Sequence, residues 1–318
     1  MAALGECMVE LREDPELGFS YAFAGDTLNV ATYMRRLLPR AAFGVEYVTA
    51  LGDDPFSDRM LASWHAERIG TTFVRRLAGE LPGLYWITNR PDGDREFFYW
   101  RSASAARHLW RSGGLDLGQT LGADDLLYLS AISLAILPPG DRESLLEQVA
   151  ALRAAGVRVA YDSNYRPRLW SSREEAAAVH HRMLVAVDFF ITSFPDESAL
   201  LGDRTVDETV NRLFACEVPE WVVRAEPGVT ITRDHGRRAV EPLAPALVRD
   251  TTGAGDAFNA AYLCARLVGH DPAAGIAAGH RIARIVVQNR GAIIPRELTP
   301  MLDELLNGTV ASGGSPPA

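Results

Sequence analysis

The residues best suited to chemistry lie in the run Asp-Thr-Thr-Gly-Ala-Gly-Asp-Ala-Phe-Asn at positions 250–259, and a helical pattern follows them. Gly253, Ala254 and Gly255 have little or no side chain, so consecutive backbone N–H groups can approach an anion there. The dipole of the following helix adds partial positive charge. Asp256 lies at the edge of this anion hole, where its carboxylate can take the proton of a hydroxyl that attacks a γ-phosphate. A helix N-cap turn is the plainer interpretation of the same run.

A second set of polar residues lies near the start of the chain, in Ala-Gly-Asp-Thr-Leu-Asn-Val-Ala at positions 24–31. Gly25 at a strand-to-helix turn lets substrate hydroxyls approach the backbone. Asp26 and Asn29 offer those hydroxyls acceptors and donors. A helix cap explains these residues equally well when they are taken alone.

Two aromatic segments, Leu84-Tyr85 and residues 97–106, are predicted to be lid strands that carry one cation. Alternation along the second strand places Tyr99 and Arg101 on one face. A guanidinium is fork-shaped and suits a carboxylate of a ligand. The alternative is an aromatic lid core with Arg101 in solvent.

The segment Tyr-Asp-Ser-Asn-Tyr-Arg-Pro-Arg-Leu-Trp at 161–170 follows a predicted strand. In α/β folds this is the usual place for ligand-binding groups. Asn164 and Arg166 are its candidate binding residues, and we interpret Arg168 as a surface charge.

These segments together resemble the signatures of the ribokinase-like (PfkB) carbohydrate kinases. Residues 250–259 match the family's second signature, and residues 24–31 resemble the first, with Ala24 in place of one of two glycines. Within the family the chain most resembles the 2-keto-3-deoxygluconate kinases along essentially its whole length. The supporting segments are Gly5-Glu6-Cys7-Met8-Val9-Glu10, Thr49 to Asp58, Tyr99 to Ala106 and Asn164 to Trp170.

The resemblance implies ATP-dependent phosphorylation of 2-keto-3-deoxygluconate to its 6-phosphate, with ATP and Mg²⁺ as cofactors and K⁺ as a further cation. It implies that Asp256 is the general base and that Asp250 with Thr252 holds the monovalent cation. Arg166 is expected to reach between sugar acid and phosphates. The implied sugar contacts are Gly25, Asp26, Asn29, Tyr85, Tyr99, Arg101 and Arg166; the implied nucleotide contacts are Asn164, Arg166, Gly253, Gly255, Asn289 and Ala292.

Two segments depart from the family pattern. The family's Asn-x-x-Glu segment is Ser193-Phe-Pro-Asp196 here and is followed by Glu197. Both carboxylates suit a water-rich magnesium ion, and Ser193 is assigned to the nucleotide side. Where relatives have a Lys-x-Gly-x-x-Gly-like nucleotide loop, this chain has Arg224-Ala-Glu-Pro-Gly228, so Arg224 and Gly228 are predicted nucleotide contacts in an ambiguous register.

The elements that must position these residues follow from short apolar runs that alternate with amphipathic stretches, the pattern of βα units on a mainly parallel sheet. The predicted fold is α/β, a ribokinase-like three-layer αβα sandwich with a small β-sheet lid. Its predicted strands are 47–50, 126–129, 157–161, 189–192 and 221–224, its predicted helices include 55–69, 142–155 and 260–268, and its lid strands lie within about 8–23 and 84–101, with a turn at Asp92-Gly93. One kinase domain is expected over 1–307, with a disordered tail over 308–318.

Composition excludes several classes of protein. All 32 basic residues are arginine, which excludes both a Walker-type P-loop and a Schiff-base lysine. A net charge of −9 argues against a nucleic-acid partner. No stretch is apolar enough to span a membrane or form a signal peptide. The three separated cysteines suit reduced thiols, so we expect a cytoplasmic protein.

Two other functions remain open at this point. A fructokinase or another neutral-sugar kinase would use the same fold, and a catalytically silent sugar-binding sensor would keep the cavity without the chemistry. The resemblance also implies a homo-oligomer, a homodimer built through the lid sheets.

Overall fold

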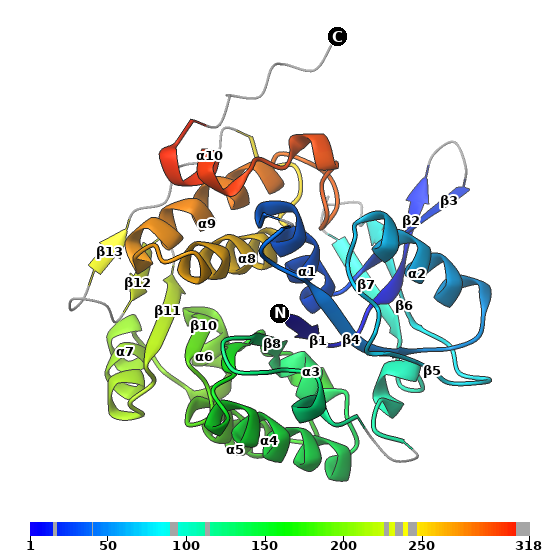
Figure 1. Ribbon diagram of the computed structural model, residues 1–318, viewed down its shortest axis with the longest axis horizontal. Coiled ribbons are helices and arrows are strands. Elements are labelled where there is room, and N and C mark those ends of the chain that lie inside the picture. The colour runs from blue at the N-terminus through cyan, green and yellow to red at the C-terminus, as the bar shows by residue number, and fades with distance from the viewer. Residues whose placement is uncertain are drawn as a thin grey trace.

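The computed structural model describes residues 1–14, 18–39, 41–89, 95–111, 115–225, 229–232, 238–240 and 247–309. Its centre is a nine-stranded sheet in the order β13-β12-β11-β10-β9-β8-β1-β4-β5 (Figure 1). The strands from β11 to β5 in this order run parallel, and β12 and β13 are antiparallel to their neighbours. The strands are β1 Ala2–Leu4, β4 Glu46–Leu51, β5 Val74–Arg76, β8 Leu126–Ser130, β9 Arg158–Asp162, β10 Phe189–Ser193, β11 Glu220–Ala225, β12 Val229–Thr232 and β13 Arg238–Val240.

Helices cover both faces of this sheet, because successive side chains of each buried strand point into two separate cores. In β8, Tyr128 packs in the core beneath one helical layer, while Leu127 and Leu129 pack beneath the other. The first layer contains α1 Asp26–Leu37, α2 Pro55–Ala66, α8 Ala254–Leu267, α9 Pro272–Val286 and α10 Leu302–Asn307. The second contains α3 Ala131–Ala135, α4 Pro139–Ala154, α5 Arg173–Leu184, α6 Phe194–Leu201 and α7 Val206–Ala215. The predicted αβα sandwich is confirmed.

A smaller mixed sheet stands apart from the central one, in the order β3-β2-β6-β7 (Figure 1). Its strands are β2 Met8–Asp14, β3 Gly18–Ala24, β6 Gly83–Asn89 and β7 Arg95–Trp100. Two antiparallel hairpins, β2/β3 and β6/β7, are joined by parallel pairing of β2 with β6. This sheet is the predicted lid, and the predicted turn at Asp92-Gly93 lies outside the described residues.

Most differences from the predicted elements concern their ends. Strand β9 begins at Arg158 and extends to Asp162, and α2 ends at Ala66 because Arg68 adopts a left-handed backbone with φ of 60°. Strand β1 was not predicted, because three residues are too few to show a periodic pattern. Gly308 caps α10, and the remainder of the predicted tail from residue 310 lies outside the described residues. None of the helices in the described part of the chain has the length and hydrophobicity needed to cross a bilayer.

Candidate active site

A cavity of about 1390 Å³ lies where the lid sheet meets the carboxyl ends of the central strands. Tyr85 and Tyr99 line it from the lid, and Ser193 and Arg224 line it from the ends of β10 and β11. It brings together most of the residues predicted from sequence, namely Gly25, Asp26, Asn29, Tyr85, Tyr99, Arg101, Asn164, Arg166, Ser193, Asp196, Arg224, Thr252, Gly253, Gly255, Asp256 and Ala292.

The anion-hole run forms the entry to α8, which begins at Ala254. Gly253 has a left-handed backbone with φ of 75°, and a Cβ there would lie 2.4 Å from the carbonyl oxygen of Ala292. Only glycine meets both requirements. No side chain caps the helix at Gly253, so the helix-cap interpretation of Asp256 gains no support. Instead, the Asp256 carboxylate lies at the cavity and accepts a hydrogen bond of 2.7 Å from Nδ2 of Asn29.

The electrostatics of Asp256 suit a proton acceptor. Burial first, and then the negative charge of Asp26, raise the pKa of Asp256 from 3.8 to about 8, while the hydrogen bond from Asn29 opposes the shift. Catalytic bases work best with a pKa near the working pH. The neighbourhood therefore makes an ordinary carboxylate basic enough to take a hydroxyl proton.

We expect this raised pKa to appear in the pH dependence of turnover. A base must be deprotonated to act, so kcat/KM is expected to rise about tenfold per pH unit below about 8 and to level off above it. Asp26→Asn removes a negative charge that raises the pKa of Asp256, so the midpoint should move to lower pH whatever happens to KM. Asp58→Asn, on an exposed carboxylate paired with Arg76, is the matched control. An unmoved midpoint in Asp26→Asn would contradict the assignment.

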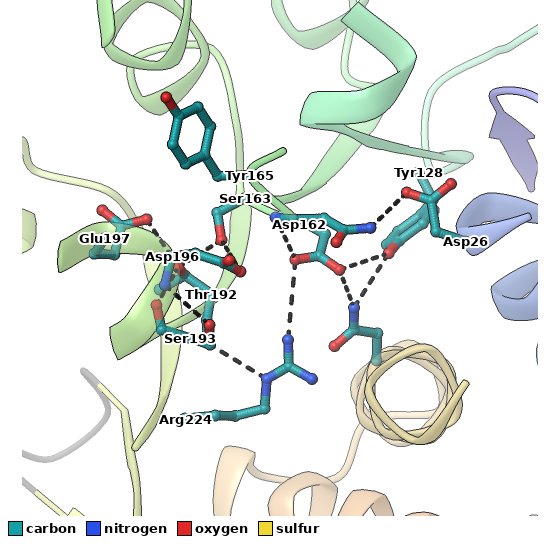
Figure 2. A network of polar contacts seen from close by, with 12 residues as sticks. Asp26, Tyr128, Asp162, Ser163, Tyr165, Thr192, Ser193, Asp196, Glu197 and Arg224 are labelled. Carbon is teal, nitrogen blue, oxygen red and sulfur yellow. Dashed lines mark hydrogen bonds and ion pairs between the residues drawn. The ribbon is translucent and has the colours of Figure 1, made fainter. Parts of the chain in front are cut away.

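Sequence reasoning missed a polar network around Asp162, a residue that lines the same cavity (Figure 2). Asp162 is the last residue of β9, and it accepts hydrogen bonds from Asn259 of α8 at 2.7 Å and from the hydroxyl of Tyr128 at 3.4 Å. Burial raises the pKa of Asp162 to about 6, against the opposing charge of Arg224. The available signal was its place at the end of a parallel strand.

Arg224 lies beside the predicted anion hole. It lies on β11, and its Nη2 is 3.9 Å from Oδ1 of Asp162 (Figure 2). A Cβ at Gly255 would lie 2.7 Å from Nη1 of Arg224, so the missing side chain at Gly255 is what lets the guanidinium reach the start of α8. Gly228, the other predicted contact of this segment, lies outside the described residues.

Arg166 and Asn164 enter the cavity after β9. Arg166 is half exposed, and its Nη1 lies 3.7 Å from Oδ1 of Asp196. Asn164 was predicted on the nucleotide side, but its amide donates to Asp26 at 2.8 Å, which places it beside the residues predicted for the sugar. Arg168, interpreted from sequence as a surface charge, is exposed but also lines the cavity.

Glu197, predicted as a magnesium ligand with Asp196, is fully buried and is not among the lining residues. Because residues in a helical turn face different sides, α6 turns Asp196 to the cavity and Glu197 into the protein. Glu197 accepts from Arg212 at 2.6 Å and from the Thr192 hydroxyl at 2.8 Å. Burial alone would raise its pKa, but His180 and these partners outweigh burial and lower the pKa to about 2. The structure therefore contradicts the prediction for Glu197, and Asp196 stays a predicted magnesium ligand.

Glu197→Gln and Asp196→Asn are expected to separate these two carboxylates. Removing one charge of a buried ion pair costs about 3 to 5 kcal/mol, so Glu197→Gln should lower Tm while the magnesium dependence of turnover stays near wild type. Asp196→Asn should instead raise the Mg²⁺ concentration needed for half-maximal activity with little change in Tm. Thermal melts measure the change in Tm, and magnesium titrations of activity measure the Mg²⁺ requirement. A shifted Mg²⁺ requirement in Glu197→Gln would show that Glu197 is a magnesium ligand after all.

The residues predicted for the monovalent cation and the nucleotide loop are connected through Asp250. Its carboxylate accepts from the backbone N–H of Thr252 at 2.8 Å and of Gly291 at 2.9 Å, which ties the two loops together. The Ala292 carbonyl accepts from a tyrosine hydroxyl of α1 and lies against Gly253. The side chain of Asn289 does not reach the cavity, because its amide donates back to Ile285 of α9 at 2.8 Å.

On the lid, Tyr85 and Tyr99 stack with ring centroids 5.7 Å apart at the cavity wall. Arg101 follows β7, and its Nη2 pairs with the carboxylate of Glu6. The alternative in which Arg101 is solvated is not what the structure shows, since only 11% of this side chain is exposed. Sequence reasoning did not assign Glu6 a role.

Comparison with known proteins agrees with this geometry. Residues 1–299 match the model of the pfkB family of carbohydrate kinases. The 2-dehydro-3-deoxygluconokinase of Escherichia coli K12 is 42% identical over 308 residues, covering 94% of this chain and 98% of that protein. The fold is similar to a PfkB protein from Polaromonas sp. JS666, with a TM-score of 0.81, 24% identity and coverage of 96% and 98%. It is also similar to Salmonella enterica aminoimidazole riboside kinase, solved with its riboside and an ATP analog, with a TM-score of 0.81, 20% identity and coverage of 98% and 99%.

Proposed function

This chain belongs to the pfkB family of carbohydrate kinases, and we propose that it transfers the γ-phosphoryl group of ATP to the primary hydroxyl of 2-keto-3-deoxygluconate. The product is the 6-phosphate. The relatives support the substrate, since 2-dehydro-3-deoxygluconokinases match at 40 to 42% identity over most of the chain. Membership of the family confirms the predicted resemblance.

The observation that carries the proposal is the meeting of a raised-pKa carboxylate and an arginine-lined wall in one cavity. Asp256 lies at the amino end of α8, while Arg101 enters from the lid side. A substrate bound between these two residues could place its carboxylate at Arg101 and the hydroxyl at its other end at Asp256. A sugar acid offers both groups.

We assign the chemistry as follows. Asp256 takes the proton of the attacking hydroxyl, and Asn29 holds its carboxylate in place. The backbone N–H groups from Gly253 to Gly255 and the guanidinium of Arg224 stabilise the charge that develops on the transferring phosphoryl group. These donors are set by the fold before the reaction and need no rearrangement during it.

Magnesium fits the residues present in a limited way. The described residues contain no group of three acidic, histidine or cysteine side chains that could hold a metal alone. Asp196 offers a cavity-lining carboxylate, which suits an ion that is held mainly by phosphates and waters. When bound, Mg²⁺ would neutralise phosphate charge.

We also propose a K⁺ ion near Asp250 and Thr252, one kinase domain over 1–307, and action in the cytoplasm, where ATP is available.

The deciding measurement is ADP release across 2-keto-3-deoxygluconate, its galacto epimer, fructose and ribose. We expect the keto acids to have the highest kcat/KM, because a neutral sugar brings no carboxylate to the Arg101 guanidinium, whose Nε has no acceptor among the described residues. A preference for fructose would replace the proposal with a neutral-sugar kinase. No turnover with any of them would favour a sugar-binding sensor.

A further inference from the structure

Glu6 lies in the loop between β1 and β2 and is one of the most buried charged residues of the chain. The residue is 2% exposed, yet it lines the same cavity as Asp256. One carboxylate oxygen, Oε2, pairs with Nη2 of Arg101. The function proposed above makes no use of this carboxylate.

The other oxygen of Glu6 is what points to a ligand. Oε1 has no hydrogen-bond donor among the described residues, and neither has Nε of Arg101 an acceptor. A buried carboxylate oxygen without a donor is costly. Gly83 lies against this oxygen, and a Cβ there would lie 2.7 Å from Oε1, so the missing side chain leaves Oε1 its position. A charged acceptor and a charged donor, both without a partner among the described residues, therefore belong to two adjacent residues that line the cavity.

We propose that Glu6 is a substrate-binding residue whose Oε1 accepts a hydrogen bond from a hydroxyl of the sugar acid. The inference rests on the proposed function for the acid end of the substrate, which faces the adjacent Arg101. The carboxylate of Glu6 only accepts hydrogen bonds, and the guanidinium of Arg101 only donates them. The two side chains together therefore complement a substrate that carries both a hydroxyl and a carboxylate. Glu6 and Arg101 together would therefore favour an acid that also carries a hydroxyl over an acid without one.

Glu6→Gln tests this with little change of shape. Because Arg101 can only donate, the glutamine must turn its carbonyl to Arg101 and its NH₂ group to the cavity. An acceptor for the substrate hydroxyl is thereby replaced by a donor. We expect KM for 2-keto-3-deoxygluconate to rise about 10- to 100-fold, the usual effect of losing a hydrogen bond to a charged group.

The probe that isolates this contact is 2-oxohexanoate, a six-carbon 2-oxo acid without hydroxyls, used as a competitive inhibitor. Its inhibition constant should stay within about twofold in Glu6→Gln, because its carboxylate still meets Arg101, and should rise in Arg101→Ala. A parallel rise of KM and inhibition constant in Glu6→Gln would mean that Glu6 only positions Arg101. An unchanged KM would mean that water or Arg101 satisfies Oε1. Either result overturns the proposal.

Controls keep the test interpretable. Glu67→Gln changes another carboxylate–guanidinium pair, the partly buried pair of Glu67 with Arg36, which does not line the cavity, and should leave KM unchanged. If Glu6→Gln does not fold, Gly83→Ala is measured instead, because its Cβ would lie 2.7 Å from Oε1 and displace it, and the same comparison of KM with the inhibition constant decides the result. If the wild type prefers a neutral sugar, the proposed function fails, while Glu6 is still tested by KM for that sugar's hydroxyls.

Discussion

Asp256→Asn is expected to lower kcat by about 10² to 10⁴, the usual contribution of general acid–base catalysis. Asparagine is isosteric and can still accept the hydrogen bond from Asn29, so the fold of the site should persist. It cannot take a proton from the attacking hydroxyl. ADP release under saturating substrates measures the loss, and an unchanged Tm shows that it is chemical.

The matched control for this variant is Asp271→Asn. Asp271 caps α9 by accepting from the N–H of Ala274, and asparagine caps a helix about as well as aspartate. The control should therefore keep wild-type kcat. If Asp256→Asn also kept it, Asp256 would be only a residue of the first helical turn, and the base would have to be sought elsewhere.

Arg101→Ala is expected to lower kcat/KM for 2-keto-3-deoxygluconate by about 30- to 5,000-fold, which corresponds to about 2 to 5 kcal/mol for truncating one partner of a buried charge pair. The value for fructose should change much less, since a neutral sugar offers no carboxylate. Arg166→Ala should lower both, because its half-exposed guanidinium lies near Asp196, the residue proposed to hold the magnesium of the nucleotide. The comparison requires kcat/KM for both sugars in three proteins.

Stability must be measured beside this comparison, because Arg101→Ala leaves the buried Glu6 without its cation. Arg101→Lys is the matched variant: it keeps a positive charge for Glu6 but loses the planar fork that suits a carboxylate. We expect Arg101→Lys to be more stable than Arg101→Ala and still selectively impaired for the acid. If kcat/KM fell equally for both sugars in folded variants, the sugar-acid assignment would be wrong and only the assignment as a carbohydrate kinase would remain.

Much of the fold was predictable because its signals are local. The central strands are apolar runs buried on both faces, and each is bounded by polar residues near its ends, as at Asp162. The glycine-rich turn into α8 was predictable for the same reason, since its small residues stand directly before a helical pattern in the chain. Strand β1 was missed because its three residues owe their conformation to pairing with β4 and β8.

The partners of the charged groups were not predictable in this way. Asp196 and Glu197 are adjacent and chemically alike, and only the packing of α6 against α7 and β10 decides that one lines the cavity and the other meets Arg212. Asn164 was placed with the nucleotide, yet it bonds to Asp26 from a segment more than a hundred residues away. Such contacts depend on where the strands end relative to one another.

The family, the alternation of strands and helices, and the chemical types available for phosphoryl transfer could all be predicted from the sequence, because these features depend on residues close together in the chain. The tertiary structure alone decided the pairing of Glu6 with Arg101, the network of Asp162 with Asn259, and the pKa of Asp256. Electrostatic interactions depend on the distance between the groups in space and on their burial, and neither can be predicted from the spacing of residues along a chain.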